Sequence, residues 1–264
     1  MPRTARIDLP GLLQHVIVRG IERRDIFVDD RDRRLFLERL SQLLSKTDVE
    51  CLAWALMSNH FHLLLRLRST KLSVFMRRLL TGYAIVFNLL HKRSGHLFQN
   101  RYKSIVCQED AYLLELVRYI HLNPLRAGLV KTIDELDRYP WCGHAVLMGN
   151  HELSGQSAAD VLLLFNRSKS SARHEYRDFV IEGIKNGRRD DLVGGGLRRS
   201  QGDSLSGEYE AADTRILGCG EFVESLWRET ESVGVTGAKI SLVGIIHNTA
   251  ETFGVNAELL RQRN

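Results

Sequence analysis

The stretch Trp54-Ala-Leu-Met-Ser-Asn-His-Phe-His-Leu-Leu-Leu65 contains the pattern that decides the fold of this chain. Side chains alternate between the two faces of a β-strand, so His60 and His62 would share one face while Phe61 points to the other. Two neutral imidazoles side by side form half of a divalent-metal site. A pair of exposed or hydrogen-bonded strand histidines is the alternative reading, and these residues alone leave it open.

The segments around this stretch show helical and strand periodicity. Apolar residues recur at helical spacing over 35–44 and 72–90, and a third helix is predicted from 109 to about Asn123, where Pro124 disfavours continuation. Strands are predicted over 12–19, 49–57, 60–68 and 105–108, with Ser58 and Asn59 as the turn between the second and third. The order β-α-β-β-α-β-α predicts an α+β fold, namely a ferredoxin-like antiparallel sheet with helices on one face.

The chain changes character after Gly149. Residues 186–208 mix charged residues with glycine and serine, which is typical of a flexible linker. Further helices are predicted over 158–165, 173–184, 220–231 and 240–253. We therefore expect three regions: a domain over 1–150, a helical extension and linker over 151–212, and a small helical C-terminal region over 213–264 whose pattern resembles a partial helix-turn-helix.

Composition places the chain among ordinary globular proteins. It has 264 residues, of which 44% are hydrophobic and 26% charged. No run has the length of a membrane span and the N-terminus has no signal-peptide core, so we expect a cytoplasmic protein without a membrane partner. The four cysteines are far apart and form no Cys-x-x-Cys pair, which predicts reduced thiols rather than a zinc site.

Basic residues gather around the histidine pair. Residues 1–150 hold 23 Lys and Arg against 15 Asp and Glu, whereas residues 151–264 hold 14 against 17, which gives the net charge of +5. Residues 51–108 contain nine Lys and Arg and no acidic residue. A basic surface of this kind favours a polyanionic partner, and nucleic acid is the usual one.

A tyrosine and an asparagine on the third helix could complete a reactive centre. Tyr119 and Asn123 are four residues apart and so would be neighbours on one helical face. The amide oxygen of Asn123 suits Mg²⁺ or Mn²⁺, and a bound cation would activate the Tyr119 phenol as a nucleophile. Tyr83, Tyr102 and Tyr112 are rival phenols, and Tyr112 is the strongest of them because it lies on a similar face of the helix. His121 falls on a different side and is expected to be structural.

Three ordered motifs resemble one known family. They are Met57-Ser-Asn-His-Phe-His-Leu-Leu-Leu65, Ser94-Gly-His-Leu-Phe-Gln-Asn-Arg-Tyr-Lys-Ser104 and Arg118-Tyr-Ile-His-Leu-Asn-Pro-Leu-Arg-Ala-Gly-Leu-Val130, and Tyr139-Pro-Trp-Cys142 matches the phrase that closes the domain. Together they resemble the single-tyrosine HUH transposases, and among these the subfamily associated with repetitive extragenic palindromes. The resemblance covers about residues 5–150. Residues 242–260 more faintly resemble the DNA-binding domain of the chromosomal replication initiator.

The resemblance implies a ferredoxin-like fold and a defined chemistry. It assigns the metal pair to His60 and His62, the nucleophile to Tyr119 and a further metal ligand to Asn123. Members of the family cleave and rejoin single-stranded DNA beside hairpins through a 5′-phosphotyrosine and a free 3′-OH, which implies DNA transposition or recombination. The implied cofactor is Mg²⁺ or Mn²⁺, the implied partner is single-stranded or hairpin DNA, and the protein would be a monomer or a homodimer.

Several basic and aromatic residues are predicted to contact the DNA. Cationic side chains would bind backbone phosphates, and an aromatic ring would stack on an unpaired base. The predicted set is Arg66, Arg77, Arg78, Arg101, Tyr102, Lys103 and Arg126. Two other functions stay open at this point: a non-catalytic DNA-binding regulator that keeps the fold, and a metal-dependent nuclease or RNA-processing enzyme that activates water.

Overall fold

One five-stranded sheet, in the order β2-β3-β1-β4-β5, forms the centre of the fold. The computed structural model describes residues 6–187, 189, 192 and 211–232. The strands are β1 (Leu13–Arg19), β2 (Glu50–Leu56), β3 (His60–Arg66), β4 (Lys103–Cys107) and β5 (Ile216–Leu217). Neighbouring strands are antiparallel except β4 and β5, which are parallel. The predicted α+β fold is confirmed, and β5 adds a parallel edge strand to the expected antiparallel sheet.

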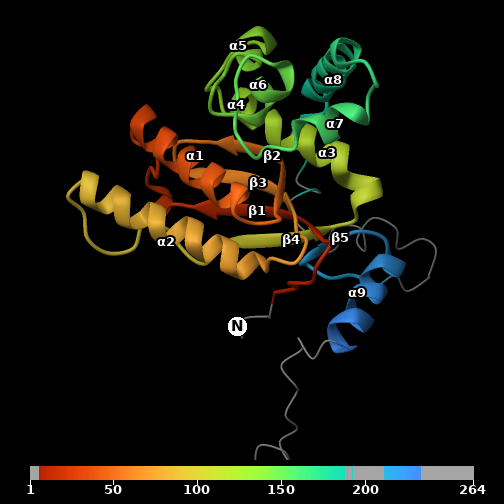
Figure 1. The fold of residues 1–264 in the computed structure, drawn as a ribbon, viewed down its shortest axis with the longest axis horizontal. Coiled ribbons are helices and arrows are strands. Elements are labelled where there is room, and N and C mark those ends of the chain that lie inside the picture. Colours follow the sequence, from red (N-terminus) through yellow and green to blue (C-terminus); the bar gives the residue numbers. More distant parts are fainter. Residues whose placement is uncertain (1–5, 188, 190–191, 193–210, 233–264) are drawn as a thin grey trace, which may run out of the picture. The chain divides into compact units, whose positions relative to one another are not determined.

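Helices cover both faces of this sheet rather than one (Figure 1). On one face, α1 (Asp30–Ser45) and α2 (Leu72–Leu90) pack against Phe61, Leu63 and Leu65 of β3. On the other face, α3 (Glu109–His121) packs against Leu64 of β3 and Ile105 of β4. The two outer layers arise because all the inner strands carry apolar residues at both alternating positions. The expectation of helices on a single face therefore describes α1 and α2 only.

Four short helices and the longer α8 extend the layer that contains α3. They are α4 (Asn123–Arg126), α5 (Ile133–Asp137), α6 (Gly143–Met148), α7 (Ala158–Leu163) and α8 (Lys169–Ile184). The helices predicted over 158–165 and 173–184 correspond to α7 and α8. Residues 8–223 group into one compact unit by their contacts, and the predicted boundary at residue 150 stays a prediction.

The C-terminal region is described in part. The helix predicted over 220–231 is present as α9 (Gly220–Ser232). The helix predicted over 240–253, the partial helix-turn-helix and most of the predicted linker lie outside the described residues.

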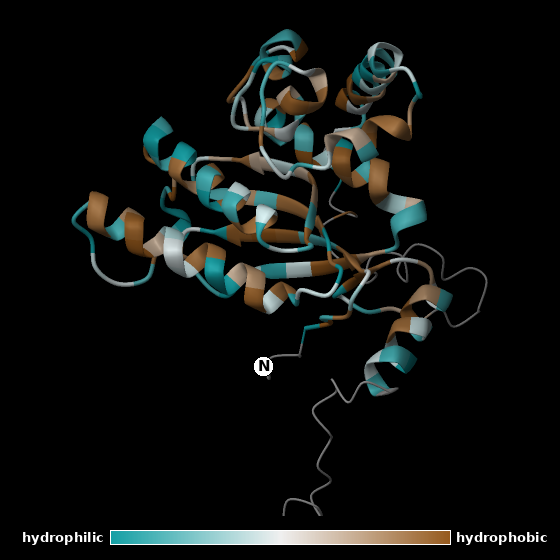
Figure 2. Cartoon of the chain, viewed as in Figure 1, coloured by the Kyte–Doolittle hydropathy of each residue, from teal (hydrophilic) through white to brown (hydrophobic). Residues whose placement is uncertain are grey.

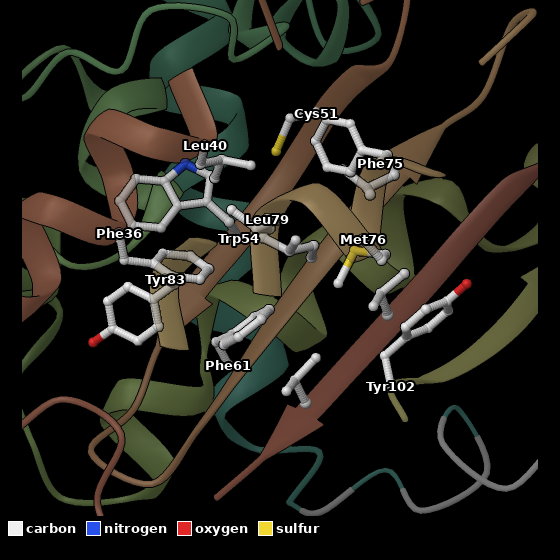
Figure 3. Packing of buried hydrophobic residues seen from close by; sticks show 14 of the residues in the cluster. Phe36, Leu40, Cys51, Trp54, Phe61, Phe75, Met76, Leu79, Tyr83 and Tyr102 are labelled. Carbon is white, nitrogen blue, oxygen red and sulfur yellow. The ribbon is translucent and has the colours of Figure 1, made fainter. Parts of the chain in front are cut away.

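Aromatic rings fill the core between the sheet and the α1–α2 layer. Phe61 and Phe36 have ring centroids 4.6 Å apart, and Tyr83 packs edge-on to Phe36 at 5.2 Å (Figure 3). The Tyr83 hydroxyl donates a hydrogen bond to the Ile26 carbonyl at 2.5 Å, so its polar end is satisfied inside the core. These contacts place Phe61 beneath the sheet, as the alternation of the strand predicts, and leave the histidines on the opposite face.

Carboxylates cap the N-termini of α1 and α2. The Asp29 side chain accepts from the backbone N–H of Asp32 and caps α1. The Asp8 carboxylate, which precedes β1, accepts from the N–H groups of Leu72 and Ser73 and so caps α2 from a distance in sequence.

Helix α2 is long and apolar enough to cross a membrane by length and composition alone. Its apolar stripe is nevertheless buried against the sheet, and the buried residues are Leu72, Phe75, Met76, Leu79, Tyr83 and Phe87. Figure 2 shows the apolar strands beside helices that alternate between hydrophobic and hydrophilic positions. A core helix meets the same criterion, so the criterion does not assign α2 to a membrane.

Two leucines of α2 test this burial. Leu79 is fully buried, whereas Leu89 is 75% exposed. We expect Leu79→Ala to lower the free energy of unfolding by about 2–5 kcal/mol because it leaves a cavity. Leu89→Ala, the matched control, should change it by less than about 0.5 kcal/mol. Urea denaturation measures both, and equal effects of the two substitutions would show that α2 does not pack as described.

Candidate active site

The register between β1 and β3 assembles a cluster of three imidazoles. Ile17 pairs with His62 and Arg19 with His60, so His15 lies diagonally beside His62 on the same face. The His15 Nε2 atom is 2.9 Å from His62 Nδ1, and the two rings stack with centroids 5.2 Å apart. The His60 and His62 rings are 5.3 Å apart. The predicted imidazole pair is therefore a group of three.

Helix α3 places Tyr119 against this cluster. The buried face of α3 contains Leu116, Val117 and Ile120, which pack on the sheet, and Tyr119 is partly buried at the margin of that contact. Its ring meets His62 edge-on at 6.1 Å and His15 edge-on at 5.9 Å, measured between centroids. The rival Tyr112 is partly buried in the same apolar cluster. Tyr119 is thus the predicted phenol that the structure brings to the histidines.

Burial keeps the three imidazoles neutral. It lowers the pKa of His60 to about 4 and that of His15 to about 3, with the charges of Arg19 and Lys103 as the respective second causes. The pKa of His62 is lowered well below its usual value, first by burial and then by its two histidine neighbours. A neutral imidazole has a lone pair available for a metal ion, so all three groups are in the state that coordination requires near pH 7.

Two asparagines flank the cluster. Asn59 in the β2–β3 turn lies with its Oδ1 2.7 Å from His60 Nδ1, and its Nδ2 donates to the Arg23 carbonyl. Asn123 begins α4 rather than ending α3, and its Nδ2 donates to the carbonyls of Tyr119 and Ile120. Because two carbonyls accept from its NH₂ group, the Oδ1 atom of Asn123 is the end left for a ligand.

Cationic side chains lie close to the reactive groups. Arg19 is exposed and pairs with His60 across the sheet, and Lys103 pairs with Ile17 on the same face. The guanidinium of Arg126 lies over the Tyr119 ring, 5.5 Å from its centroid, and donates to the Gly183 carbonyl of α8. A concentration of positive charge beside a phenol favours both its phenolate and an approaching phosphate.

Other residues of the predicted DNA-binding set lie elsewhere. Arg66 forms ion pairs with Glu50 and Glu109, so its charge is already balanced. Arg77 and Arg78 are exposed on α2, which covers the opposite face of the sheet from Tyr119. These three residues are not brought to the histidine cluster.

Two residues predicted to contact DNA, in the loop before β4, differ in exposure. Arg101 is exposed. Tyr102 is only 7% exposed and belongs to the apolar cluster between the sheet and α2, at the margin seen in Figure 3. Its ring is therefore packed in the core, and its stacking on a base stays a prediction.

A buried polar network attaches α8 to α3. The Tyr176 hydroxyl lies 2.7 Å from the Nδ1 atoms of both His121 and His144, and His144 Nε2 is 2.7 Å from Asp137. Arg177 also donates to Asp137 at 2.8 Å. His121 faces this network rather than Tyr119, as its position on the helix predicts, and the network fixes α8 where Gly183 can hold Arg126.

The cluster fits half of a divalent-metal site. Within the part of the chain that the structure describes, no group of three His, Cys, Asp or Glu side chains is arranged to hold a metal ion. His60 and His62 are two neutral nitrogen donors, and Asn123 offers an amide oxygen one turn beyond Tyr119. A cation here would therefore need this amide, water or a phosphate oxygen as further ligands.

His15 and Arg19 are the site residues that sequence reasoning missed. Alternation along 13–19 places them on one face of a strand, which is visible in the sequence. The pairing of that strand with β3, and the register that puts Arg19 opposite His60, depend on contacts over more than 40 residues, which the local pattern does not contain.

Comparison with known proteins connects this site to a family. Residues 9–123 match the family model described as "Transposase IS200 like". That segment includes His15, His60, His62, Tyr119 and Asn123. No curated protein matches the chain.

Two solved structures are similar to the chain. A REP-associated tyrosine transposase bound to a REP hairpin is 18% identical, and the match covers 58% of this chain and 90% of that one with a TM-score of 0.46. A Deinococcus radiodurans protein assigned as a transposase is also 18% identical, with 44% and 92% covered and a TM-score of 0.32. These likenesses are too distant to assign residue roles. The family match itself covers residues 9–123, and the clustered histidines and Tyr119 lie within that segment, so this part of the chain is similar to the IS200-like transposases.

Proposed function

We propose that this protein is a metal-dependent strand-transferase that cleaves and rejoins single-stranded or hairpin DNA through a 5′-phosphotyrosine at Tyr119. The observation that carries the proposal is the edge contact of the Tyr119 ring with His62 and His15, inside a segment that matches a transposase family. In a transposase of this kind, a nucleophile has to lie beside the groups that bind the scissile phosphate.

The chemistry exchanges one phosphodiester bond for another. The Tyr119 oxygen attacks the phosphorus and loses its proton, the bond from phosphorus to the 3′ oxygen breaks, and that oxygen takes up a proton to leave a free 3′-OH. A 3′-OH can then attack the phosphotyrosine and reverse the step. No external energy source is needed because the covalent intermediate conserves the phosphodiester bond.

His60, His62 and Asn123 would hold the cation, Mg²⁺ or Mn²⁺. When bound, the cation would polarise a phosphate oxygen and offset the negative charge that develops at phosphorus. The neutral state of the imidazoles supports this assignment. Arg126 would stabilise the Tyr119 phenolate from the ring face, and Arg19 and Lys103 would attract the DNA backbone to the same side of the sheet.

The nucleophile is tested by a pair of tyrosine variants. We expect Tyr119→Phe to abolish the covalent adduct with a labelled single-stranded hairpin in the presence of Mn²⁺, because phenylalanine lacks the attacking oxygen. Tyr112→Phe, the matched control on the same helix, should keep it. Denaturing electrophoresis followed by peptide mapping detects the adduct.

The outcomes separate the functions that the sequence leaves open. An adduct that survives Tyr119→Phe removes this residue from the mechanism. Cleavage without any adduct in the unmodified protein indicates a nuclease that activates water. Hairpin binding with neither cleavage nor adduct indicates a DNA-binding regulator.

The metal ligands are tested by His60→Ala. We expect this variant to lose Mn²⁺-dependent cleavage by about 10²-fold or more, since one of two nitrogen donors is missing. His174→Ala removes a side chain that is 80% exposed on α8 and serves as the control. Chelation should stop the unmodified protein as well, and cleavage that continues in excess chelator would contradict the proposed metal dependence.

Arginines on opposite faces of the sheet test which face binds the DNA. Arg126→Gln should lower the rate of adduct formation by about 10²-fold, because it removes a charge that is fixed beside the phenol. Arg77→Gln, on the opposite face of the sheet, should leave that rate close to the unmodified value. Single-turnover kinetics with saturating hairpin measures both. A larger loss in Arg77→Gln would place the DNA on the α2 side and contradict the proposed surface.

A further inference from the structure

The two predicted metal ligands each have a partner at Nδ1. His60 Nδ1 is 2.7 Å from Asn59 Oδ1, and His62 Nδ1 is 2.9 Å from His15 Nε2. A neutral imidazole has one proton shared between its two nitrogens, so the partner at Nδ1 influences whether Nε2 has a lone pair. Hydrogen bonds of this kind tune the metal affinity of a histidine.

The Asn59 contact has one direction. The Nδ2 group of Asn59 donates to the Arg23 carbonyl, so the Oδ1 atom faces His60 and can only accept. His60 therefore has its proton on Nδ1. In the neutral ring with its proton on Nδ1, the Nε2 atom of His60 has a free lone pair.

The His15 contact can run in either direction. If His15 donates from Nε2, then His62 has its proton on Nε2 and that nitrogen cannot bind a cation. If His62 donates from Nδ1, its Nε2 lone pair is free, as in His60, and His15 has its own proton on Nδ1. The Nδ1 atom of His15 is buried and without a hydrogen-bond partner among the described residues, so neither arrangement is fixed by a further contact on that side.

We propose that His15 is a positioning residue that accepts a hydrogen bond from His62 Nδ1 and so gives His62 the tautomer that binds a metal ion through Nε2. This inference rests on the proposed function, because it takes His60 and His62 as the ligands. His15 would thus do for His62 what Asn59 does for His60. His15 also contacts the Tyr119 ring edge-on, so one side chain packs against the proposed nucleophile and hydrogen-bonds to the metal ligand His62.

The test is a titration of the full chain with Mn²⁺ by isothermal calorimetry. His15→Leu removes the acceptor and places an apolar side chain at this buried position. We expect the dissociation constant for Mn²⁺ to rise by about 10- to 100-fold. His15→Gln keeps an acceptor, its Oε1 atom, and should restore an affinity close to that of the unmodified protein. His174→Leu controls for loss of an exposed imidazole. Thermal melts establish that each variant is folded.

A second readout reports the proton itself. In protein with ¹⁵N-labelled imidazoles and bound Zn²⁺ as a diamagnetic probe, NMR should find the proton of His62 on Nδ1 and a bare Nε2 on His15. A proton on Nε2 of His15 overturns the proposal, and so does a folded His15→Leu variant that binds Mn²⁺ as tightly as the unmodified protein. If the unmodified protein binds no Mn²⁺, the metal centre of the proposed function fails together with this inference. If the unmodified protein binds Mn²⁺ and the folded His15→Leu variant binds it equally tightly, only the role of His15 fails.

Discussion

The antiparallel pairing of β1 with β3 is the constraint on which the rest of the structure depends. A shift of one residue in this register would turn His15 and Arg19 to the other face and break the contact between His15 and His62. The register is held because Val16 and Val18 of β1, with Phe61 and Leu63 of β3, fill the core beneath the sheet. The hydrophobic core on one face thereby fixes the chemistry on the other.

The two faces of the sheet differ in composition. The face covered by α1 and α2 is a packed apolar layer, whereas the face covered by α3 combines apolar packing with the imidazoles near Tyr119. Among the described residues, Arg19 and Lys103 share the face of the sheet with the histidines, and Arg126 lies over the Tyr119 ring. Helix α8, which lies beyond the segment matched by the family model, takes part through the hydrogen bond from Arg126 to Gly183.

Local patterns predict much of this arrangement, and long-range contacts decide the remainder. Strict alternation places His60 and His62 together, because it follows from backbone geometry alone. Helical spacing leaves Tyr112 as a rival of Tyr119, and the contacts of the fold bring Tyr119 to the histidines. The burial of Tyr102 and the pairing of Arg66 with Glu50 and Glu109 depend on segments distant in sequence. His15 was missed for the same reason, since a strand pattern does not name the neighbouring strand. The second layer of helices could not be predicted from the strands, because a continuous apolar strand indicates burial but not which element covers each face.

The central claim is that the imidazole pair and the Tyr119 phenol form one centre around a bound cation. Paramagnetic broadening by Mn²⁺ in protein with ¹³C-labelled tyrosine rings tests this most directly, because the effect falls steeply with distance from the ion. The account predicts that the Tyr119 ring signals broaden at the lowest Mn²⁺ concentrations, while those of Tyr83, buried on the opposite face of the sheet, stay sharp. Sharp Tyr119 signals beside a bound Mn²⁺ ion would contradict it.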